Sequence, residues 1–440
     1  MKPQITDIHS SLSRRHFLKT TGGTAAGLSL LGTLGLERAV HAASDDTIKI
    51  ALIGCGGRGT GAASQAMNTG KVKLVAIADM RQGQVDKCLD SLQTQNPGKI
   101  DVPKERQFIG FDAYKQAIAA ADVVLLASPP GFRPAHYEEA VRQGKHIFME
   151  KPLATDAPGI RQILAANEDA KKKNLKVAVG FQRHHEKGYI ETVKHIHDGL
   201  IGDVLALRVY WRGGSRAGLV REPGESEIQY QIRNWYYFTW LSGDHIVEQH
   251  CHNIDVGNWI KGAYPIRAHG VGGRQVRNAR ENGQIFDHFS IEYEYADGAR
   301  MFSVCSQIPR MWGDVSEHVI GSKGKADLGH GYMIKPNDGA AIRMKSDGNG
   351  NGWQQEHYPF FDAIRKNVTY NEAEYGAKST MTAIMGRMAA YSGDLIEWDE
   401  ALNSKLELVP KQVSENMTPP VVPDKDGFYP VAIPGVTKAL

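Results

Sequence analysis

Three ionisable side chains in this sequence are suited to move a hydride and a proton. Lys151 lies in the triplet Glu150-Lys151-Pro152 after an apolar run, and Glu248 and His252 follow further along, four positions apart. An ammonium group can donate to a substrate hydroxyl and stabilise charge as hydride leaves its carbon. The imidazole of His252 can accept the hydroxyl proton, and Glu248 can orient the ring or share its proton. We therefore predict Lys151, His252 and Glu248 as catalytic residues.

A dinucleotide is the hydride carrier that the sequence predicts. Residues 47–61, TIKIALIGCGGRGTG, combine an apolar run with Gly54, Gly56 and Gly59 in the spacing G-x-G-x-x-G. The first glycine permits a tight turn, the second lets a pyrophosphate approach the backbone, and the third lets the following helix pack on the strand. The next apolar run ends at Asp79, about twenty residues on, where a carboxylate can accept from the adenosine ribose.

The acid at position 79 also bears on the choice of cofactor. A carboxylate there would repel a 2′-phosphate, so we expect NAD, although the nearby Arg81 keeps NADP possible.

The stretch from residue 44 to about 151 must position these groups. Apolar strands alternate there with helical patterns, which predicts an α/β domain with a parallel, doubly wound sheet. In such a sheet the ligand lies outside the carboxyl ends of the strands, so the turns there should contact the cofactor. The cofactor-binding residues predicted on this basis are Gly54, Gly56, Gly57, Arg58, Gly59, Asp79, Arg81, Ser128, Pro129, His136, Glu150 and Lys151.

The later part of the chain predicts a second, α+β domain. Segments with strand alternation lie at 204–211, 266–276, 289–295, 299–306 and 317–320. Long strands joined by short turns, such as the hairpin turn Ala296-Asp297-Gly298, predict an antiparallel sheet with one face covered. We place the nucleotide-binding domain at 44–170, the second domain at 171–400, and an aperiodic tail at 401–440.

One helix, predicted to start near Gly243, carries Glu248 and His252. The polar or aromatic residues that recur there at steps of three and four, and so share a face, are His245, Glu248, His252, Asp255 and Trp259. A solvated face is the ordinary explanation, but this face has no Lys or Arg before Lys261, which favours a cleft wall. Trp235 belongs to an aromatic cluster before this helix, which suits a sugar pocket. Arg183 and His185 follow another predicted strand, which is expected to end at the cleft. Substrate contacts are thus predicted from Arg183, His185, Trp235 and Asp255.

The same stretch allows a metal site as an alternative. Histidine and carboxylate side chains bind zinc or iron, and the residues concerned are His245, Glu248, His250, His252 and Asp255. A nicotinamide site already supplies the chemistry, so we expect no metal.

Taken in their order, these motifs resemble the Gfo/Idh/MocA family. The resemblance is carried by the glycine loop with Asp79, the Ser128-Pro129-Pro130 turn with His136, the triplet around Lys151, and residues 243–259. It implies a Rossmann domain followed by an open, mostly antiparallel sheet domain, with a sugar or cyclitol site between them, and assembly into dimers or tetramers.

The resemblance also assigns roles to single residues. It implies that Lys151 lies near the reacting carbon and that a cis peptide precedes Pro152. Two positions depart from the family pattern, which usually has Asp in place of Glu248 and Gly in place of His250. The longer carboxylate of Glu248 is expected to shift the substrate, and the imidazole of His250 to fill space that the family leaves open. Both changes bear on the proton relay and on which substrate is bound.

The first 42 residues predict an export signal. Ser13-Arg14-Arg15-His16-Phe17-Leu18-Lys19 precedes a mildly apolar, glycine-rich run at 20–36, and Ala39-Val40-His41-Ala42 is typical of a cleavage site. The apolar run is short for a bilayer span, which argues against a stable membrane anchor. We expect recognition by the twin-arginine machinery, export of the folded chain, and a periplasmic or otherwise extracytoplasmic location.

Composition narrows the partners further. A net charge of +3 is small for 440 residues, so no nucleic-acid partner is indicated. The four cysteines, Cys55, Cys88, Cys251 and Cys305, form no C-x-x-C pair, which argues against a disulfide framework.

Export constrains the function, because we expect no pool of free NAD outside the cytoplasm. The first hypothesis is therefore an oxidoreductase that acts on a sugar or cyclitol hydroxyl with a tightly bound, recycled cofactor. The second is a redox-neutral glycoside hydrolase, in which transient oxidation of a ring hydroxyl allows elimination of the aglycone. The third is a sugar- and nucleotide-binding protein without turnover, against which the presence of Lys151, Glu248 and His252 argues.

Overall fold

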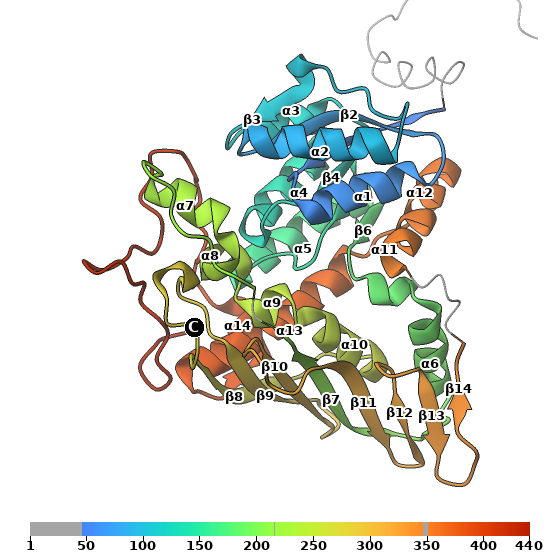
Figure 1. Cartoon of the computed structure of the whole chain (residues 1–440). Coiled ribbons are helices and arrows are strands. Elements are labelled where there is room, and N and C mark those ends of the chain that lie inside the picture. The colour runs from blue at the N-terminus through green and yellow to red at the C-terminus, as the bar shows by residue number, and fades with distance from the viewer. Residues whose placement is uncertain (1–45, 215, 346–350) are drawn as a thin grey trace, which may run out of the picture. The chain divides into compact units, whose positions relative to one another are not determined.

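A six-stranded parallel sheet confirms the predicted doubly wound domain (Figure 1). Its order is β3-β2-β1-β4-β5-β6, and the strands are β1 (Ile48–Ile53), β2 (Val72–Asp79), β3 (Gln107–Ile109), β4 (Val123–Leu126), β5 (His146–Met149) and β6 (Val177–Val179). The computed structural model describes residues 46–214, 216–345 and 351–440. The predicted export signal lies outside them.

Helices cover both faces of this sheet because successive strand residues point to opposite sides. Val123 and Leu125 of β4 lie in one apolar cluster with helices α1 and α2, whereas Val124 and Leu126 lie in a second cluster with α3, α4 and α5. The bounds are α1 (Gly57–Met67), α2 (Gln82–Gln95), α3 (Ala113–Ala119), α4 (Arg133–Arg142) and α5 (Ala157–Lys172).

The first domain extends beyond the predicted boundary at residue 170. Strand β6 pairs with β5 in the parallel sheet, so that boundary is wrong. A late segment also returns to this domain as α11 (Gly352–Gln355) and α12 (His357–Lys366). Phe360 and Phe361 of α12 are fully buried in the same cluster as Ile50 of β1. Residues far apart in the sequence thus complete one core.

The second sheet has nine strands in the order β14-β13-β12-β11-β7-β10-β9-β8-β15. All its pairs are antiparallel except β7 with β10, which confirms the mostly antiparallel prediction. The strands are β7 (Val204–Arg212), β8 (Arg267–Gly273), β9 (His288–Glu294), β10 (Arg300–Ser306), β11 (Asp314–Gly321), β12 (Gly324–Asp327), β13 (Met333–Pro336), β14 (Ile342–Arg343) and β15 (Ile396–Glu397).

The two faces of this sheet differ. Helices α10 (Cys251–Lys261) and α13 (Ala373–Ser392) cover one face (Figure 1), whereas large apolar side chains such as Val271 and Phe302 are exposed on the other. The predicted hairpin turn joins β9 to β10, where Tyr295 N donates to Ala299 O at 3.0 Å.

The continuous helix predicted from Gly243 is wrong, because the backbone is interrupted twice. Gly243 (φ +79°) follows α8 (Thr239–Ser242), and Asp244 (φ +71°) precedes α9 (His245–Glu248). A right-handed helix cannot continue through residues with positive φ. Before α10 starts, His250 N donates to the carbonyl five residues back, at His245. His245 and Glu248 on α9 therefore do not share one continuous helical face with His252, Asp255 and Trp259 on α10.

The remaining elements are short. They are α6 (Lys187–His197), α7 (Glu227–Arg233), α14 (Trp398–Asn403), and the 3₁₀ turns η1 (Lys104–Arg106), η2 (Pro130–Phe132), η3 (Gln182–His185), η4 (Trp235–Tyr237) and η5 (Arg280–Asn282). From residue 404 onward the chain has no helix or strand, and α14 runs past residue 401, where the tail was predicted to start. Within the described ranges, no helix is both long and apolar enough to span a bilayer.

Candidate active site

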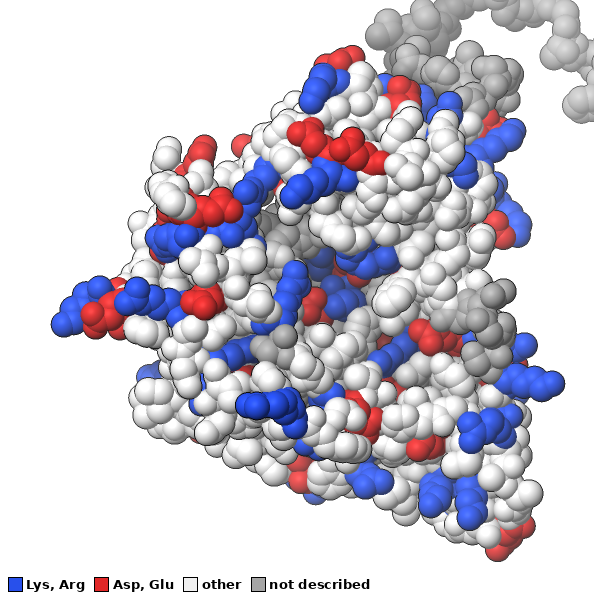
Figure 2. Space-filling view, in the orientation of Figure 1, with Lys and Arg blue, Asp and Glu red and all other residues white. Residues whose placement is uncertain are grey.

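A cleft of about 860 Å³ lies at the carboxyl ends of the parallel strands and reaches α9 and α10 of the second domain. Figure 2 shows this face hollowed between the two sheet domains, with basic and acidic side chains inside the hollow. The predicted site residues that line it are Gly54, Gly56, Gly57, Arg58, Gly59, Asp79, Arg81, Ser128, Pro129, Glu150, Lys151, Trp235, Glu248 and His252. The two halves of the predicted site thus share one cavity.

The glycine loop has the shape that a dinucleotide requires. A Cβ on Gly59 would lie 2.0 Å from the carbonyl oxygen of Gly54, whereas a Cβ on Gly56 would meet nothing within 4 Å. Gly59 therefore serves the packing of α1 on β1, and the space beside Gly56 is open to a ligand. No side chain caps the first turn of α1, so its backbone N–H groups are free to bind a pyrophosphate.

Asp79 lies at the end of β2 beside the same loop. Its carboxylate accepts from Cys55 N at 2.7 Å and from Arg81 N at 3.1 Å, which fixes the side chain where a ribose would approach. Burial raises the pKa of Asp79. The Arg81 guanidinium lies 3.6 Å from Glu222, across the mouth of the cleft.

Arg58 is held by carboxylates of the protein itself. Its Nε donates to Glu150 at 2.5 Å, and a second nitrogen donates to Glu356 at 2.9 Å. These ion pairs join the glycine loop to the end of β5 and to the segment between α11 and α12. We infer that Arg58 shapes the cofactor cleft through these pairs, since its nitrogens are largely occupied.

Lys151 and Glu248 form an ion pair at the inner end of the cleft. Lys151 Nζ lies 2.6 Å from the carbonyl oxygen of Glu248 and 3.2 Å from Glu248 Oε1. Burial alone would lower the pKa of Lys151, but the nearby acidic groups, chiefly Glu248 through its charge and hydrogen bond, together outweigh burial and the pKa is raised. The amine therefore stays protonated. The peptide before Pro152 is cis, as the family resemblance implies.

His252 lies in the same cleft but makes no hydrogen bond to Glu248 in the described part of the chain. Its ring packs between Phe181 and Trp211, with centroid distances of 5.9 and 6.0 Å, and its Nδ1 is buried without a partner among these residues. Burial, with the nearby positive charge of Lys151, lowers the pKa of His252 well below its ordinary value. The imidazole is therefore neutral, and Glu248 serves Lys151 rather than His252.

Four predicted site residues lie behind the cleft surface. His136 contacts Ser128 Oγ through Nδ1 at 3.1 Å, and Arg183 forms a buried ion pair with Glu317. His185 lies 3.4 Å from Glu372, and Asp255 accepts from Ser379 at 2.7 Å and contacts His184. The structure therefore does not bring Arg183, His185 and Asp255 together with Lys151 as cleft-lining groups. Asp255 lies on α10 three residues after His252, and its carboxylate is taken up by Ser379 and His184 behind the cleft.

The side chains of the alternative metal site also diverge. His245 is buried against Phe289, and His250 Nε2 contacts Ser303 Oγ at 2.8 Å. Among residues 46–214, 216–345 and 351–440, no group of three or more His, Cys, Asp or Glu side chains is placed to hold a metal ion.

Comparison with protein families matches both domains of this architecture. Residues 48–181 match the oxidoreductase family with an NAD-binding Rossmann fold, and residues 189–327 match the Gfo/Idh/MocA C-terminal domain. The chain belongs to the Gfo/Idh/MocA family. Residues 11–30 match the twin-arginine translocation signal sequence.

Curated relatives of this family member carry two kinds of names. An inositol 2-dehydrogenase/D-chiro-inositol 3-dehydrogenase of Halalkalibacterium halodurans is 32% identical over 43% of this chain, an alignment that spans 45% of the relative's own length. An inositol 2-dehydrogenase of Cereibacter sphaeroides is 27% identical over 67% of this chain and 77% of the relative. A glycosyl hydrolase family 109 protein of Shewanella pealeana is 27% identical over 44% of each chain.

Solved structures agree on the fold. The scyllo-inositol dehydrogenase of Lactobacillus casei with bound NAD(H) and scyllo-inositol matches with a TM-score of 0.61 at 22% identity, over 80% of this chain and all of that one. At this identity the likeness concerns the arrangement of the two domains.

Sequence reasoning missed one wall of the cleft of this Gfo/Idh/MocA protein. The wall comes from the segment between β7 and α8 and from the start of α11, and the residues missed are Arg216, Leu219, Glu222, Ile232 and Trp353. Local periodicity carries no signal for such a long irregular segment. The cluster of arginines and acids between residues 212 and 233 was the available hint.

Proposed function

We propose that this protein oxidises a hydroxyl group of a sugar or cyclitol by hydride transfer to NAD. The observation that carries the proposal is the shared cleft, in which the Lys151–Glu248 pair and His252 lie at the inner end and the glycine loop with Asp79 forms the adjoining wall. The inositol dehydrogenase names of two relatives support a polyhydroxylated ring as substrate.

The protonation states of Lys151 and His252 suit this reaction. Bound NAD supplies the acceptor for the hydride that leaves the substrate carbon. Lys151, kept protonated by Glu248, donates to the substrate oxygen and stabilises its developing negative charge. His252, kept neutral by burial, accepts the hydroxyl proton at Nε2, the nitrogen opposite its buried Nδ1.

The outer part of the cleft suits a polyol. Trp235 and Arg216 lie against each other, with the guanidinium 5.9 Å from the ring centroid, and Arg233, which is paired with Glu225, lies in the same wall. An aromatic face and hydrogen-bond donors together match the apolar faces and hydroxyls of a sugar ring. We propose Trp235 as a substrate contact on this basis.

The signal sequence supports periplasmic location and a cofactor that stays bound. A chain exported folded through the twin-arginine machinery can carry NAD with it, whereas released NADH could not be reoxidised by a cytoplasmic pool. The cofactor would then be reoxidised within the site by a second substrate or an external acceptor.

Nucleotide extraction tests this proposal most directly. We expect the mature protein, purified after export and then denatured, to release about one NAD per chain, and myo-inositol or glucose to reduce the bound nucleotide in the intact protein. A protein that neither carries NAD nor binds added NAD would contradict the proposal.

The cofactor choice has its own test. Asp79 is held beside the ribose position, and Arg81 is drawn toward Glu222, so NAD is favoured over NADP. Asp79→Ser should lower the preference for NAD by at least tenfold in relative Kd, measured by fluorescence titration. Equal affinities of the unchanged protein for both nucleotides would refute this assignment.

A second function, redox-neutral glycoside hydrolysis, is favoured by the family 109 relative and by the departures at Glu248 and His250. An aryl glycoside assay separates the two. Aglycone release that depends on bound NAD and yields no net NADH would establish hydrolysis. A chain that binds NAD and sugar but shows neither reaction would be the non-catalytic binding protein of the third hypothesis.

We also propose that the exposed face of the nine-stranded sheet pairs with a second copy. Val271 is 67% exposed and Phe302 is 40% exposed on this face, and such apolar surface is typical of subunit interfaces. Light scattering should give the mass of a dimer or tetramer, and Val271→Lys with Phe302→Lys should give a monomer. The exposed Val220 outside the sheet, changed to Lys, is the control.

A further inference from the structure

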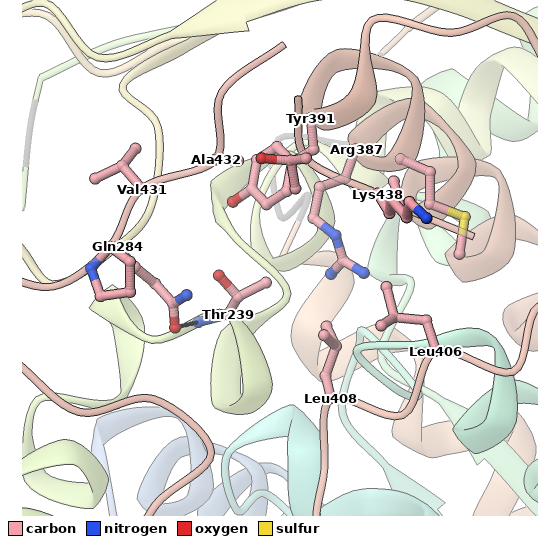
Figure 3. A pocket seen from close by; sticks show the side chains of 13 residues that line it. Thr239, Gln284, Arg387, Tyr391, Leu406, Leu408, Val431, Ala432 and Lys438 are labelled. Carbon is pink, nitrogen blue, oxygen red and sulfur yellow. Dashed lines mark hydrogen bonds between the residues drawn. The ribbon is translucent and has the colours of Figure 1, made fainter. Parts of the chain in front are cut away.

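A second, smaller pocket of about 270 Å³ lies away from the cleft, where the C-terminal tail crosses α8 and α13 (Figure 3). Its walls come from α8, the segment around Gln284, α13 and the C-terminal tail, and they include Thr239, Arg387, Tyr391, Leu406, Leu408 and Val431. None of these residues lines the cofactor cleft. The pocket is therefore a separate site.

Arg387 of α13 is the charged group of this pocket. The residue is 3% exposed, and Figure 3 shows its guanidinium directed toward the space bounded by Thr239, Leu406 and Leu408. Nη1 donates to Thr155 O at 2.7 Å and to Gly243 O at 3.0 Å. In the described part of the chain, Arg387 has no carboxylate ion pair, and no bond is made by its Nε or Nη2.

A buried guanidinium that makes no ion pair is costly, because burial penalises the charged form, and the charges of Asp156 and Asp244 offset this only in part. This effect lowers the pKa of Arg387. An anion that enters the pocket would supply the missing charge and accept from the free side of the planar guanidinium, a geometry that suits a carboxylate.

The other walls define the rest of the ligand. Leu406, Leu408 and Val431 present apolar surface opposite the guanidinium, and Thr239 adds a hydroxyl. The amide of Gln284 and the amino group of Lys438 also line the pocket. A buried guanidinium beside extended apolar walls matches a carboxylate on an apolar body better than a strongly hydrated phosphate.

The pocket is connected to the catalytic segments by direct hydrogen bonds. Thr155 follows Lys151 after three intervening residues, and Gly243 precedes α9, which carries Glu248. Tyr391, a second pocket residue, donates to Asp244 Oδ2 at 2.6 Å, and Asp244 caps the N-terminus of α9. Both partners of the Lys151–Glu248 pair are thus tied to residues of the pocket wall.

We propose that this pocket binds a small organic monocarboxylate with an apolar body, and that its occupancy alters the rate of the reaction in the cleft. The guanidinium of Arg387 binds the carboxylate, and the leucines and Val431 contact the apolar body. The second half of the proposal rests on the proposed function, whereas the binding site itself does not.

Calorimetric titration of the NAD-saturated, full-length mature protein with hexanoate tests the site. We expect binding in the millimolar range or tighter, with binding of hexan-1-ol and of inorganic phosphate at least tenfold weaker. Equal binding of hexanoate and hexan-1-ol, or no binding of hexanoate, would overturn the assignment.

Two variants locate the binding. Arg387→Gln removes the charge, and Leu408→Trp fills the pocket while leaving the bonds of Arg387 to Thr155 and Gly243 in place. We expect each to weaken hexanoate binding at least tenfold. Leu408→Trp keeps the test decisive if Arg387→Gln fails to fold, and unchanged hexanoate affinity in it would refute the site.

A separate assay tests the coupling. Saturating hexanoate should change the rate of bound-nucleotide reduction at least twofold in the unchanged protein and leave it unchanged in Leu408→Trp. Hexanoate binding without a rate change would refute the coupling alone. Binding that depends on Arg387 in a protein without hydride transfer would sustain the site and contradict the proposed function.

Discussion

The two halves of the cleft are built in different ways. The cofactor half is made of backbone, with a glycine loop, the start of α1 and the end of β2 brought together by one βαβ unit. The catalytic half is made of side chains from separate segments, with Lys151 after β5, Glu248 on α9 and His252 on α10. The cofactor half depends on glycines, which leave room for the ligand. The catalytic half depends on ionisable side chains that are largely shielded from solvent.

This difference has a general consequence for mutations. Changes in the cofactor half act through shape, because an added atom collides with backbone or fills space that a ligand needs. Changes in the catalytic half act through electrostatics, because the charge of Glu248 helps to raise the pKa of Lys151, and the charge of Lys151 helps to lower the pKa of His252. The predictions below separate the two modes.

The largest effect is expected from Lys151→Ala. Loss of the ammonium removes the group that stabilises charge on the substrate oxygen, so the rate of hydride transfer should fall by about a thousandfold while NAD remains bound. Single-turnover absorbance of the reduced nicotinamide measures the rate, and extraction measures the NAD. Lys87→Ala, a change at the cleft wall on α2, is the control. Undiminished turnover in Lys151→Ala would remove Lys151 from the mechanism.

Two glycines of the same loop should respond in opposite ways. Gly59→Ala places a Cβ 2.0 Å from Gly54 O, so it should lower the free energy of unfolding by about 2 to 3 kcal/mol. Gly56→Ala meets no protein atom, so stability should be unchanged while the Kd for NAD rises about tenfold, or about 1.4 kcal/mol. Denaturant unfolding and nucleotide titration measure the two. Equal destabilisation by both changes would contradict the packing role assigned to Gly59.

Glu248→Gln should shift the pH dependence of the reaction. With the carboxylate gone, the largest of the effects that raise the pKa of Lys151 is lost, so the ammonium is lost at a lower pH than before. We expect a rate about tenfold lower near neutrality and an alkaline limb of the pH–rate profile displaced to lower pH. Glu397→Gln, at the edge strand β15, is the matched control. An alkaline limb that does not move would mean that Glu248 does not control Lys151.

The smallest effect is expected from His245→Phe. Burial lowers the pKa of His245, so the folded state stays neutral below about pH 6.5 while the unfolded state takes up a proton, and stability falls as the pH falls. Phenylalanine takes up no proton, so from pH 7.5 to pH 5.5 the variant should gain about 1.4 kcal/mol relative to the unchanged protein. Urea unfolding at both pH values measures this.

The control for His245→Phe is the exposed His269, changed to Phe. Its ring contacts solvent in both states, so its pH-dependent difference should be much smaller. A pH dependence of the same size at His245 and His269 would argue against burial as the cause.

Much of the cofactor half could be predicted from the sequence, because a strand, a glycine turn and a helix follow one another directly. β5 ends directly before Glu150, and α1 begins inside the glycine loop, at Gly57. The catalytic half was less predictable. Lys151, Glu248 and His252 line the cleft, but their pairing depends on the breaks at Gly243–Asp244 and at residues 249–250, which helical periodicity does not register.

Contacts between distant segments were the other limit. Arg58 was assigned to the cofactor because of its place in the loop, and nothing near it in the sequence indicates Glu150 or Glu356 as partners. Arg183 follows a strand as predicted, yet its charge is neutralised by Glu317 on β11. Periodicity identifies which face of an element is polar, and only the fold determines what that face meets.

The return of α12 to the parallel-sheet domain has a consequence for how the chain folds during synthesis. Phe360 and Phe361 complete the apolar cluster that contains Ile50, and Glu356 completes the ion pairs of Arg58 in the glycine loop. The nucleotide site therefore reaches its final form only after the ribosome has made the second domain up to α12. Contacts of such long sequence separation form late. A translocation route that accepts only folded chains would therefore accept this protein only after synthesis has passed α12.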